Sequence, residues 1–322
     1  MSDLEYHVPV LRDAVLGALR PAPGERAIDL TLGGGGHARA MGERLGPQGT
    51  LIGLDQDPDA IEQAARTLAG LECKVLVVRC NFAQFDGGLR SLGIASPAEE
   101  PGGGVDVMLA DLGVSSHQLD TSSRGFSFSQ DGPLDMRMSK EGPDALALIL
   151  DTTPHELARI LREGGEVPNA MRIALALKTE AAAGRLQRTS QLAALCERLM
   201  PPRHKGKGKK IHPATTVFQA LRIAVNQELE VLDTLLERAK QWMRPGGRLG
   251  IISFHSLEDR RVKQAFKKME GYCICPPKLP ICCCGWTSFG ESASKRPIVA
   301  SDKELEENPR ARSAKLRVFR FL

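Results

Sequence analysis

The sequence lacks any long apolar run, and this absence excludes a membrane-spanning helix. No stretch of the 322 residues approaches the roughly 18 consecutive apolar residues that such a helix requires. The first seven residues carry neither the apolar core of a signal peptide nor the arginines of a transit peptide. We therefore expect a cytoplasmic protein. With 42% hydrophobic residues, the chain can bury one large core and still carry an insertion.

The sequence also lacks a strong net charge. Its 43 lysines and arginines nearly balance 39 aspartates and glutamates, which leaves a formal charge of +4. A basic field over the whole molecule is therefore excluded, and only local clusters can provide contacts to nucleic acid. Two clusters are candidates: Arg310 with Arg312, and the glycine-rich residues 201–210, which we interpret as a flexible surface loop. This loop is either a phosphate-binding patch or a solvated basic surface, and its cations are Arg203, Lys205, Lys207, Lys209 and Lys210.

The eight cysteines are not distributed as in a disulfide framework. Three of them stand alone in apolar or amphipathic stretches, which is typical of core positions. The other five crowd into residues 273–284, and in a reducing compartment this crowding favours metal over disulfide. Two C-x-C pairs offer four thiolates to zinc, although this spacing is tighter than the usual C-x-x-C. The sequence leaves zinc open and we assign no metal ligand; the four thiolates belong to Cys273, Cys275, Cys282 and Cys284.

The first third of the chain alternates between predicted strands and helices. Apolar residues at helical spacing predict a helix over residues 59–69. Apolar runs predict strands near residues 26–30, 50–54, 74–79 and 105–111. This alternation is typical of an α/β fold whose mostly parallel, Rossmann-like sheet has helices on both faces, with ligands at the carboxyl ends of the strands. The polar or aromatic residues at those ends are Asp29, Asp55, Asn81, Phe82 and Asp111.

Four consecutive glycines, residues 33–36, stand between the first strand and its helix, and His37 follows them. Glycines let the backbone approach a ligand closely, and a helix start offers free N–H groups. Asp55, which ends the second strand, can accept hydrogen bonds from the hydroxyls of a ribose. Together these features indicate a site for a nucleoside cofactor.

Two cofactors compete for this site. Gly33, Gly35 and Ala38 satisfy the dinucleotide pattern G-x-G-x-x-G/A, although four glycines fit almost any such pattern. Asp29 argues against a dinucleotide, because a carboxylate just before the loop would repel a pyrophosphate. The same carboxylate suits the cationic amino acid moiety and sulfonium of S-adenosylmethionine. We therefore favour S-adenosylmethionine over a nicotinamide cofactor.

The pattern changes after about residue 112. Residues 115–137 form a long polar loop, and loops of this length are usually functional or disordered. Its phenylalanines and methionines argue against disorder. Helical patterns without an intervening strand follow at residues 154–163, 169–183 and 190–199. We therefore predict an all-helical insertion over residues 115–212.

The last third returns to the pattern of an α/β domain. A long helix is predicted over residues 216–243, a strand over 249–254 and a final strand over 315–321. The main domain is thus expected in two parts, residues 1–114 and residues 213–322.

Several short motifs occur together in one known family. They are HVPVL from His7, GGH from Gly35, DLGVSS from Asp111, RGFSF from Arg124, GPLDMR from Gly132, HPAT from His212, FQALR from Phe218, SFHSLED from Ser253 and NPRARS from Asn308. In their joint order, over essentially the whole chain, they resemble the ribosomal RNA small subunit methyltransferase H family, also called MraW. The resemblance implies a class I S-adenosylmethionine-dependent methyltransferase with an all-helical insertion.

The same resemblance implies a reaction and a set of contacts. The implied product is N4-methylcytidine in the decoding centre of 16S ribosomal RNA, so the implied partner is the small ribosomal subunit. The cofactor-contacting positions of the family correspond to Gly35, Gly36, His37, Asp55, Phe82, Asp111 and Gln118. The oligomeric state stays open, a homodimer included.

Methylation of a cytosine amino group needs positioning, because the nitrogen lone pair is delocalised into the ring. We expect Asp111 and His255 to be catalytic, by accepting hydrogen bonds from that amino group. The competing interpretation is that Asp111 only holds the cofactor and that His255 only caps the following helix. Phe126, Phe128 and the turn at residues 253–259 are candidates for the base pocket or for ordinary packing.

Two other classes of function fit parts of the sequence. A nicotinamide-dependent oxidoreductase would need a hydride-transfer site, and the sequence offers no candidate for one. An RNA-binding ribosome assembly factor with a vestigial cofactor site would have no reason to keep Gly35, Asp55 and Asp111 together.

Overall fold

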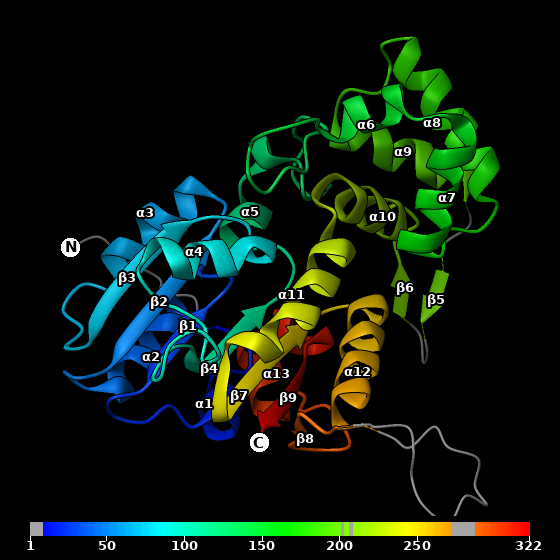
Figure 1. Ribbon diagram of the computed structural model, residues 1–322. Helices are drawn as coiled ribbons and strands as arrows, with labels where there is room; N and C mark the ends of the chain where they lie inside the picture. Colours follow the sequence, from blue (N-terminus) through cyan, green and yellow to red (C-terminus); the bar gives the residue numbers. More distant parts are fainter. Residues whose placement is uncertain (1–8, 201–202, 206–208, 272–286) are drawn as a thin grey trace, which may run out of the picture. The chain divides into compact units, whose positions relative to one another are not determined.

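The computed structural model describes residues 9–200, 203–205, 209–271 and 287–322 (Figure 1). The chain divides into two compact units: unit 1 is Met1–Gly113 with Glu230–Leu322, and unit 2 is Val114–Leu229. An insertion is therefore present, but it extends beyond the expected boundary after residue 212. None of the described helices is long and apolar enough to cross a membrane.

Unit 1 is built on a seven-stranded sheet with the order β3-β2-β1-β4-β7-β9-β8. The first five strands in this order pair in parallel, whereas β9 is antiparallel to both β7 and β8. This arrangement confirms the mostly parallel, Rossmann-like α/β fold. The strands are β1 (Arg26–Asp29), β2 (Thr50–Asp55), β3 (Lys74–Arg79), β4 (Val105–Asp111), β7 (Met243–Ser253), β8 (Gly290–Ser292) and β9 (Lys315–Phe321).

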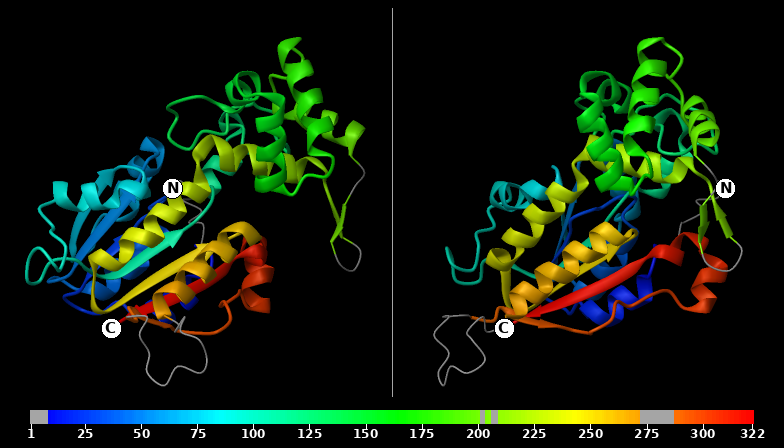
Figure 2. Two further views of the ribbon diagram at one scale, coloured as in Figure 1. Left: turned by 45° about the vertical axis from the view of Figure 1, so that its right-hand side comes forward. Right: turned by 90° about the vertical axis from the view of Figure 1, so that its right-hand side faces the viewer.

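Helices cover both faces of this sheet, because successive strand residues point to opposite faces. Ile28 and Ile52 belong to one core cluster, and their neighbours Ala27 and Leu51 belong to the other. Packed against the first face are α4 (Phe85–Ser91), α11 (Glu228–Trp242) and α12 (Ser256–Glu270). Packed against the second face are α1 (Arg12–Leu19), α2 (Gly36–Leu45) and α3 (Pro58–Thr67). Figure 2 shows α11 and α12 side by side on their face of the sheet.

Unit 2 has its own hydrophobic core, built from helices. Helices α7 and α10 approach closely at Gly165, which has no side chain. A Cβ atom there would lie 2.1 Å from the carbonyl oxygen of Thr216. The polar loop is ordered by Arg124, whose guanidinium donates to the carbonyls of Arg137 and Met138. The helices are α5 (Ser116–Asp120), α6 (Ala145–Asp151), α7 (Pro154–Gly165), α8 (Ala170–Ala182), α9 (Thr189–Leu199) and α10 (Ala214–Asn226).

The structure corrects three local expectations. The helix predicted over residues 216–243 is two helices, α10 and α11, because Gln227 adopts a left-handed conformation with φ of 50°. The strand predicted over residues 249–254 begins earlier, at Met243, and its pairing with β4 is irregular near that end. The insertion is not all-helical, because β5 (Arg203–Lys205) and β6 (Lys209–Ile211) pair as antiparallel strands within the expected flexible loop.

Candidate functional site

The glycine loop after β1 is anchored by backbone hydrogen bonds. The N–H of Gly35 donates to the carbonyl of Leu32 at 2.8 Å. Gly35 has φ of 83°, and a Cβ atom there would lie 3.3 Å from the Cα atom of Ala64. Its conformation therefore favours glycine, and a side chain at this position would also crowd α3. The loop leads into the N-terminus of α2, and the first N–H groups of a helix have no partner within the helix, so such a terminus can bind a ligand.

Asp55 connects this loop to the end of β2. Its Oδ2 atom accepts from the N–H of Gly33 at 2.8 Å, and its Oδ1 atom accepts from the N–H of Asp57 at 2.8 Å. Burial raises the pKa of the Asp55 carboxyl. Each carboxylate oxygen keeps a second lone pair after these bonds. Asp55 can thus hold the loop and accept two hydroxyl groups, although the sequence indicated only the second role.

Two carboxyls and a histidine lie together near the ends of β1 and β4; Asp29 and His37 are buried, whereas Asp111 is partly exposed. Asp29 is 1% exposed, and its Oδ1 atom accepts from the N–H of Thr31 at 3.1 Å. The Nε2 atom of His37 lies 3.7 Å from Oδ2 of Asp111. Among the residues that the structure describes, three buried atoms of this cluster have no hydrogen-bond partner: Oδ2 of Asp29, Oδ1 of Asp111 and Nε2 of His37.

The charges in this cluster are not balanced from within the protein. Burial, opposed by the N–H of Thr31, raises the pKa of Asp29 to about 7. Burial and then the carboxylates of Asp29 and Glu258 raise the pKa of Asp111 well above its ordinary value. Burial lowers the pKa of His37 to about 4, so the imidazole is neutral at pH 7. In the described part of the chain no lysine or arginine pairs with either carboxyl.

A cation fits this cluster and an anion does not. An ammonium or sulfonium group would satisfy the orphaned carboxyl oxygens and offset their mutual repulsion. A pyrophosphate would add negative charge to carboxyls that are already expensive to ionise. The donor set therefore matches the cationic end of S-adenosylmethionine, whereas Asp55 matches its ribose.

The end of β3 supplies the predicted aromatic residue. Asn81 caps the following 3-10 turn by accepting from the N–H of Ala83 at 2.9 Å, and its amide donates to Gln56 at 2.9 Å. Phe82 begins this turn and packs half-buried against the core under α4 and α11. The aromatic ring is thus tied to the segment that follows Asp55.

His255 is the N-cap of α12. Its Nδ1 atom accepts from the N–H of Glu258 at 3.4 Å, while a carboxylate oxygen of Glu258 accepts from the N–H of His255 at 3.2 Å. This capping box agrees with the competing interpretation, in which His255 caps the helix that follows it. Its Nε2 atom is still buried without a hydrogen-bond partner, 3.2 Å from a carboxylate oxygen of Glu258 but out of line for a bond. Because Nδ1 accepts from the N–H of Glu258, the neutral ring carries its proton on Nε2, which can donate a hydrogen bond but not accept one.

Three predicted residues belong to unit 2. Gln118 forms a capping box with Ser115 at the start of α5. Phe126 lies under the guanidinium of Arg124, at 5.9 Å. Phe128 packs against His212 and Phe218, with ring centroids 4.6 and 5.1 Å away. Both phenylalanines thus have packing roles within unit 2. Several candidates lie outside the described residues: Cys273, Cys275, Cys282, Cys284 and Lys207.

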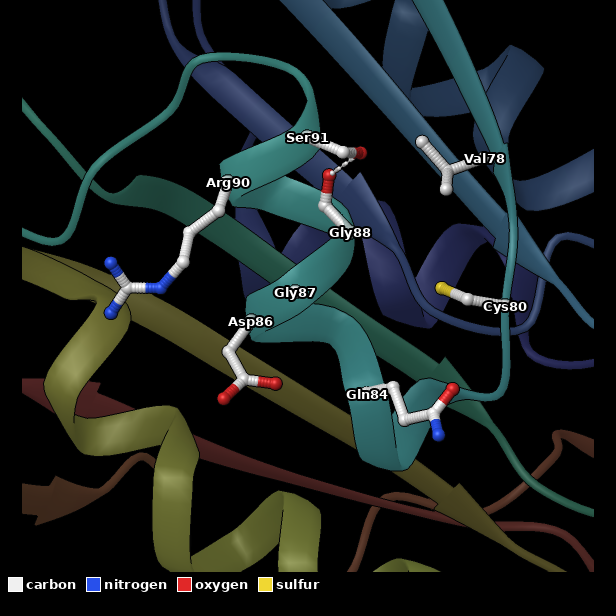
Figure 3. A pocket seen from close by; sticks show the side chains of 8 residues that line it. All are labelled: Val78, Cys80, Gln84, Asp86, Gly87, Gly88, Arg90 and Ser91. Atoms are coloured by element: carbon white, nitrogen blue, oxygen red, sulfur yellow. Dashed lines mark hydrogen bonds between the residues drawn. The ribbon is translucent and has the colours of Figure 1, made fainter.

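A separate pocket of about 610 Å³ lies between β3 and α4 (Figure 3). Its charged side chains are occupied, since Asp86 pairs with Arg238 at 3.1 Å and Arg90 pairs with Glu99 at 2.7 Å. Burial raises the pKa of the Cys80 thiol to about 11, so this sulfur is a poor nucleophile at neutral pH. The pocket offers no chemistry comparable to the acidic cluster.

Comparison with known proteins gives one consistent result. The model of the MraW methylase family matches residues 5–322. Three proteins named ribosomal RNA small subunit methyltransferase H are similar over nearly the whole chain. The protein from Syntrophotalea carbinolica is 48% identical, covering 98% of each chain. Those from Geobacter sulfurreducens and Heliobacterium modesticaldum are 48% and 44% identical, covering 97% of each chain.

Proposed function

This chain belongs to the MraW methylase family, and on that premise we propose that it methylates the N4 amino group of a cytidine in 16S ribosomal RNA. S-adenosylmethionine is the cofactor, and it supplies an electrophilic methyl group on a sulfonium. The names of the relatives support the small-subunit RNA as substrate and, with it, a cytoplasmic location for the activity. Family membership disfavours a nicotinamide-dependent oxidoreductase.

The observation that carries the proposal is the uncompensated acidic cluster beside the glycine loop. Asp29 and Asp111 are costly to ionise without a cation, and the chain provides none among its described residues. In the proposal these carboxyls face the charged end of the cofactor. Asp55 accepts the ribose hydroxyls, and Phe82 lies beside the adenine. The remaining contacts follow from the family resemblance: Gly35, Gly36 and His37 for the methionine end, and Gln118.

In the proposed reaction Asp111 and His255 act on the amino group of the target. Asp111 accepts a hydrogen bond from N4, which aligns the nitrogen with the methyl carbon, and His255 accepts one once its ring has released the N–H of Glu258. A proton leaves the methylated nitrogen, and either group can receive it. The raised pKa makes the Asp111 carboxylate more basic than an ordinary aspartate, so its contribution extends beyond charge. His255 is the alternative acceptor, through Nδ1: because this atom accepts from the N–H of Glu258, the neutral ring carries its proton on Nε2 and Nδ1 is the atom that can take up a proton.

The substrate is tested by methylating small subunits that lack the modification, followed by mass spectrometry of the nucleosides. We expect N4-methylcytidine. Methyl groups at another atom would refute the assigned chemistry. Binding of S-adenosylmethionine without transfer to RNA would instead identify an assembly factor with a cofactor site.

The catalytic roles are tested by single-turnover methylation with saturating cofactor. We expect Asp111→Asn and His255→Ala to slow transfer by about 10²-fold or more, the usual loss when a general base is removed. The exposed residues Asp151 and His155 provide matched controls as Asp151→Asn and His155→Ala. Near-wild-type rates for both site variants would mean that neither residue carries the chemistry and that water accepts the proton.

A further inference from the structure

The exposed face of α12 carries cations and no acidic residue. Arg260, Lys263 and Lys267 are exposed and follow the spacing i, i+3, i+7, so they lie along one face of the helix. We call these three residues the basic stripe. The acids of α12 lie elsewhere: Glu258 is 2% exposed, Asp259 binds Arg317 at 2.7 Å, and Glu270 accepts from the N–H of Ser292 at 2.8 Å.

The stability of the fold does not explain this stripe. Arg260 and Lys263 form no ion pair with any residue that the structure describes, whereas their neighbour Arg261 is paired with Asp233 of α11. A cation near the C-terminus of a helix is favoured by the helix dipole, but Arg260 lies in the second turn from the N-terminus. Two of the three cations of the stripe, Arg260 and Lys263, therefore have no counter-charge among the described residues.

The position of the stripe connects it to the proposed reaction. Helix α12 begins directly after His255, so the stripe runs outward from the residue that we assign to the target base. From Arg260 to Lys267 it extends about 10 Å at 1.5 Å per residue. A nucleic acid strand presents roughly three phosphates over that length. Ser256, Gln264 and Lys268, the other exposed residues of α12, are polar or charged, so its exposed surface lacks the aromatic and apolar side chains of a protein interface.

We propose that the basic stripe binds phosphates of the RNA strand next to the target cytidine. This inference rests on the proposed function and adds a contact surface to it. Cations that bind phosphates set the register of a protein on a strand without reading its sequence. The stripe would thus hold the strand while His255 and Asp111 act on its base.

The test compares two triple variants with equal loss of charge. The stripe variant combines Arg260→Gln, Lys263→Gln and Lys267→Gln. The control variant combines substitutions of exposed cations near the amino ends of the strands of the sheet: Arg20→Gln, Lys74→Gln and Arg320→Gln. Affinity for small-subunit RNA is measured from 50 to 200 mM salt, together with the kinetics of methylation and the affinity for S-adenosylmethionine.

For the stripe variant we expect the slope of log affinity against log salt to flatten by about 2, since each single-strand phosphate contact contributes about 0.7. KM should rise about 10-fold or more, while kcat and cofactor affinity stay unchanged. Arg260→Lys should keep the wild-type slope, because a point charge is enough for a phosphate. The control variant should behave as wild type.

Three outcomes would overturn the inference. One is an unchanged slope in the stripe variant, and another is an equal loss in both variants, which would reflect net charge alone. The third is normal affinity for naked RNA with weaker binding to assembled subunits, which would assign the stripe to an acidic protein surface. Failure of the proposed function is distinct from all three, because the wild-type protein would then form no N4-methylcytidine.

Discussion

Replacing Asp29 with asparagine should stabilise the cofactor-free protein at pH 8 and weaken its affinity for S-adenosylmethionine. Asp29 is 1% exposed, and its pKa is raised from 3.8 to about 7. A pKa that is higher in the folded state means that the folded state binds the proton more tightly. The associated stability is fully present below the unfolded pKa of about 4 and is lost as the pH rises through about 7.

The size of this effect follows from the shift. A shift of about three units corresponds to roughly 4 kcal/mol at pH 8, at 1.36 kcal/mol per unit. The asparagine oxygen can still accept from the N–H of Thr31, so this hydrogen bond is retained. The new amide group is buried where Oδ2 of Asp29 had no partner, and an unsatisfied group costs about 1–3 kcal/mol. The expected net gain at pH 8 is therefore about 1–3 kcal/mol.

The measurement is denaturant unfolding of the cofactor-free wild type and Asp29→Asn at pH 5 and pH 8. The gain should appear at pH 8 and vanish or reverse at pH 5, where the wild-type carboxyl is protonated. Calorimetry at pH 8 should show cofactor affinity reduced about 10-fold or more, the loss of one charged hydrogen bond. The exposed Asp151→Asn serves as control. If the asparagine variant is less stable than wild type at pH 8, the claim that Asp29 carries a buried charge without a compensating cation is refuted.

Further changes test the rest of the site. Asp55→Ala should weaken S-adenosylmethionine binding by about 2 kcal/mol or more, because two hydroxyls lose a charged acceptor; unchanged affinity by calorimetry in a folded variant would remove Asp55 from the site. Gly35→Ala should lower the free energy of unfolding by about 1 kcal/mol or more, because of its φ of 83°; wild-type stability would contradict the described loop conformation. A variant of the β5–β6 segment should bind RNA more weakly with a flatter salt slope and normal cofactor affinity, and an unchanged slope would mark a solvated surface. Its glutamine substitutions are at Lys205, Lys207, Lys209 and Lys210.

Most strands of unit 1 could be predicted from the sequence because their signals are local, but the three-residue strand β8 was not predicted. The observed bounds of β3 and β4 equal the predicted ones, since each strand holds a run of four apolar residues that ends at a charged residue. The break between α10 and α11 carried no such signal. A left-handed residue at a helix end is usually glycine, and here it is Gln227. The helical periodicity therefore continues through the break.

The β5–β6 strands could not be predicted for a related reason. Lysine and glycine have low preference for strands, so residues 201–210 indicate a loop. Residues 203–205 and 209–211 nevertheless pair as antiparallel strands, and no local signal in the sequence indicates this pairing.

The positions of the site residues could be predicted, but their energetics could not. Asp29, Asp55 and Asp111 were identified because they end strands, and this follows from sequence order. Whether a carboxyl has a partner depends on what the fold brings near it. Asp55 receives two backbone N–H groups, whereas Asp29 and Asp111 each keep an orphaned oxygen. The cofactor-free fold therefore carries an electrostatic penalty at neutral pH, and a bound cation offsets it. Cofactor affinity and folding stability are linked through the same two carboxyls, so a change that raises one is expected to lower the other.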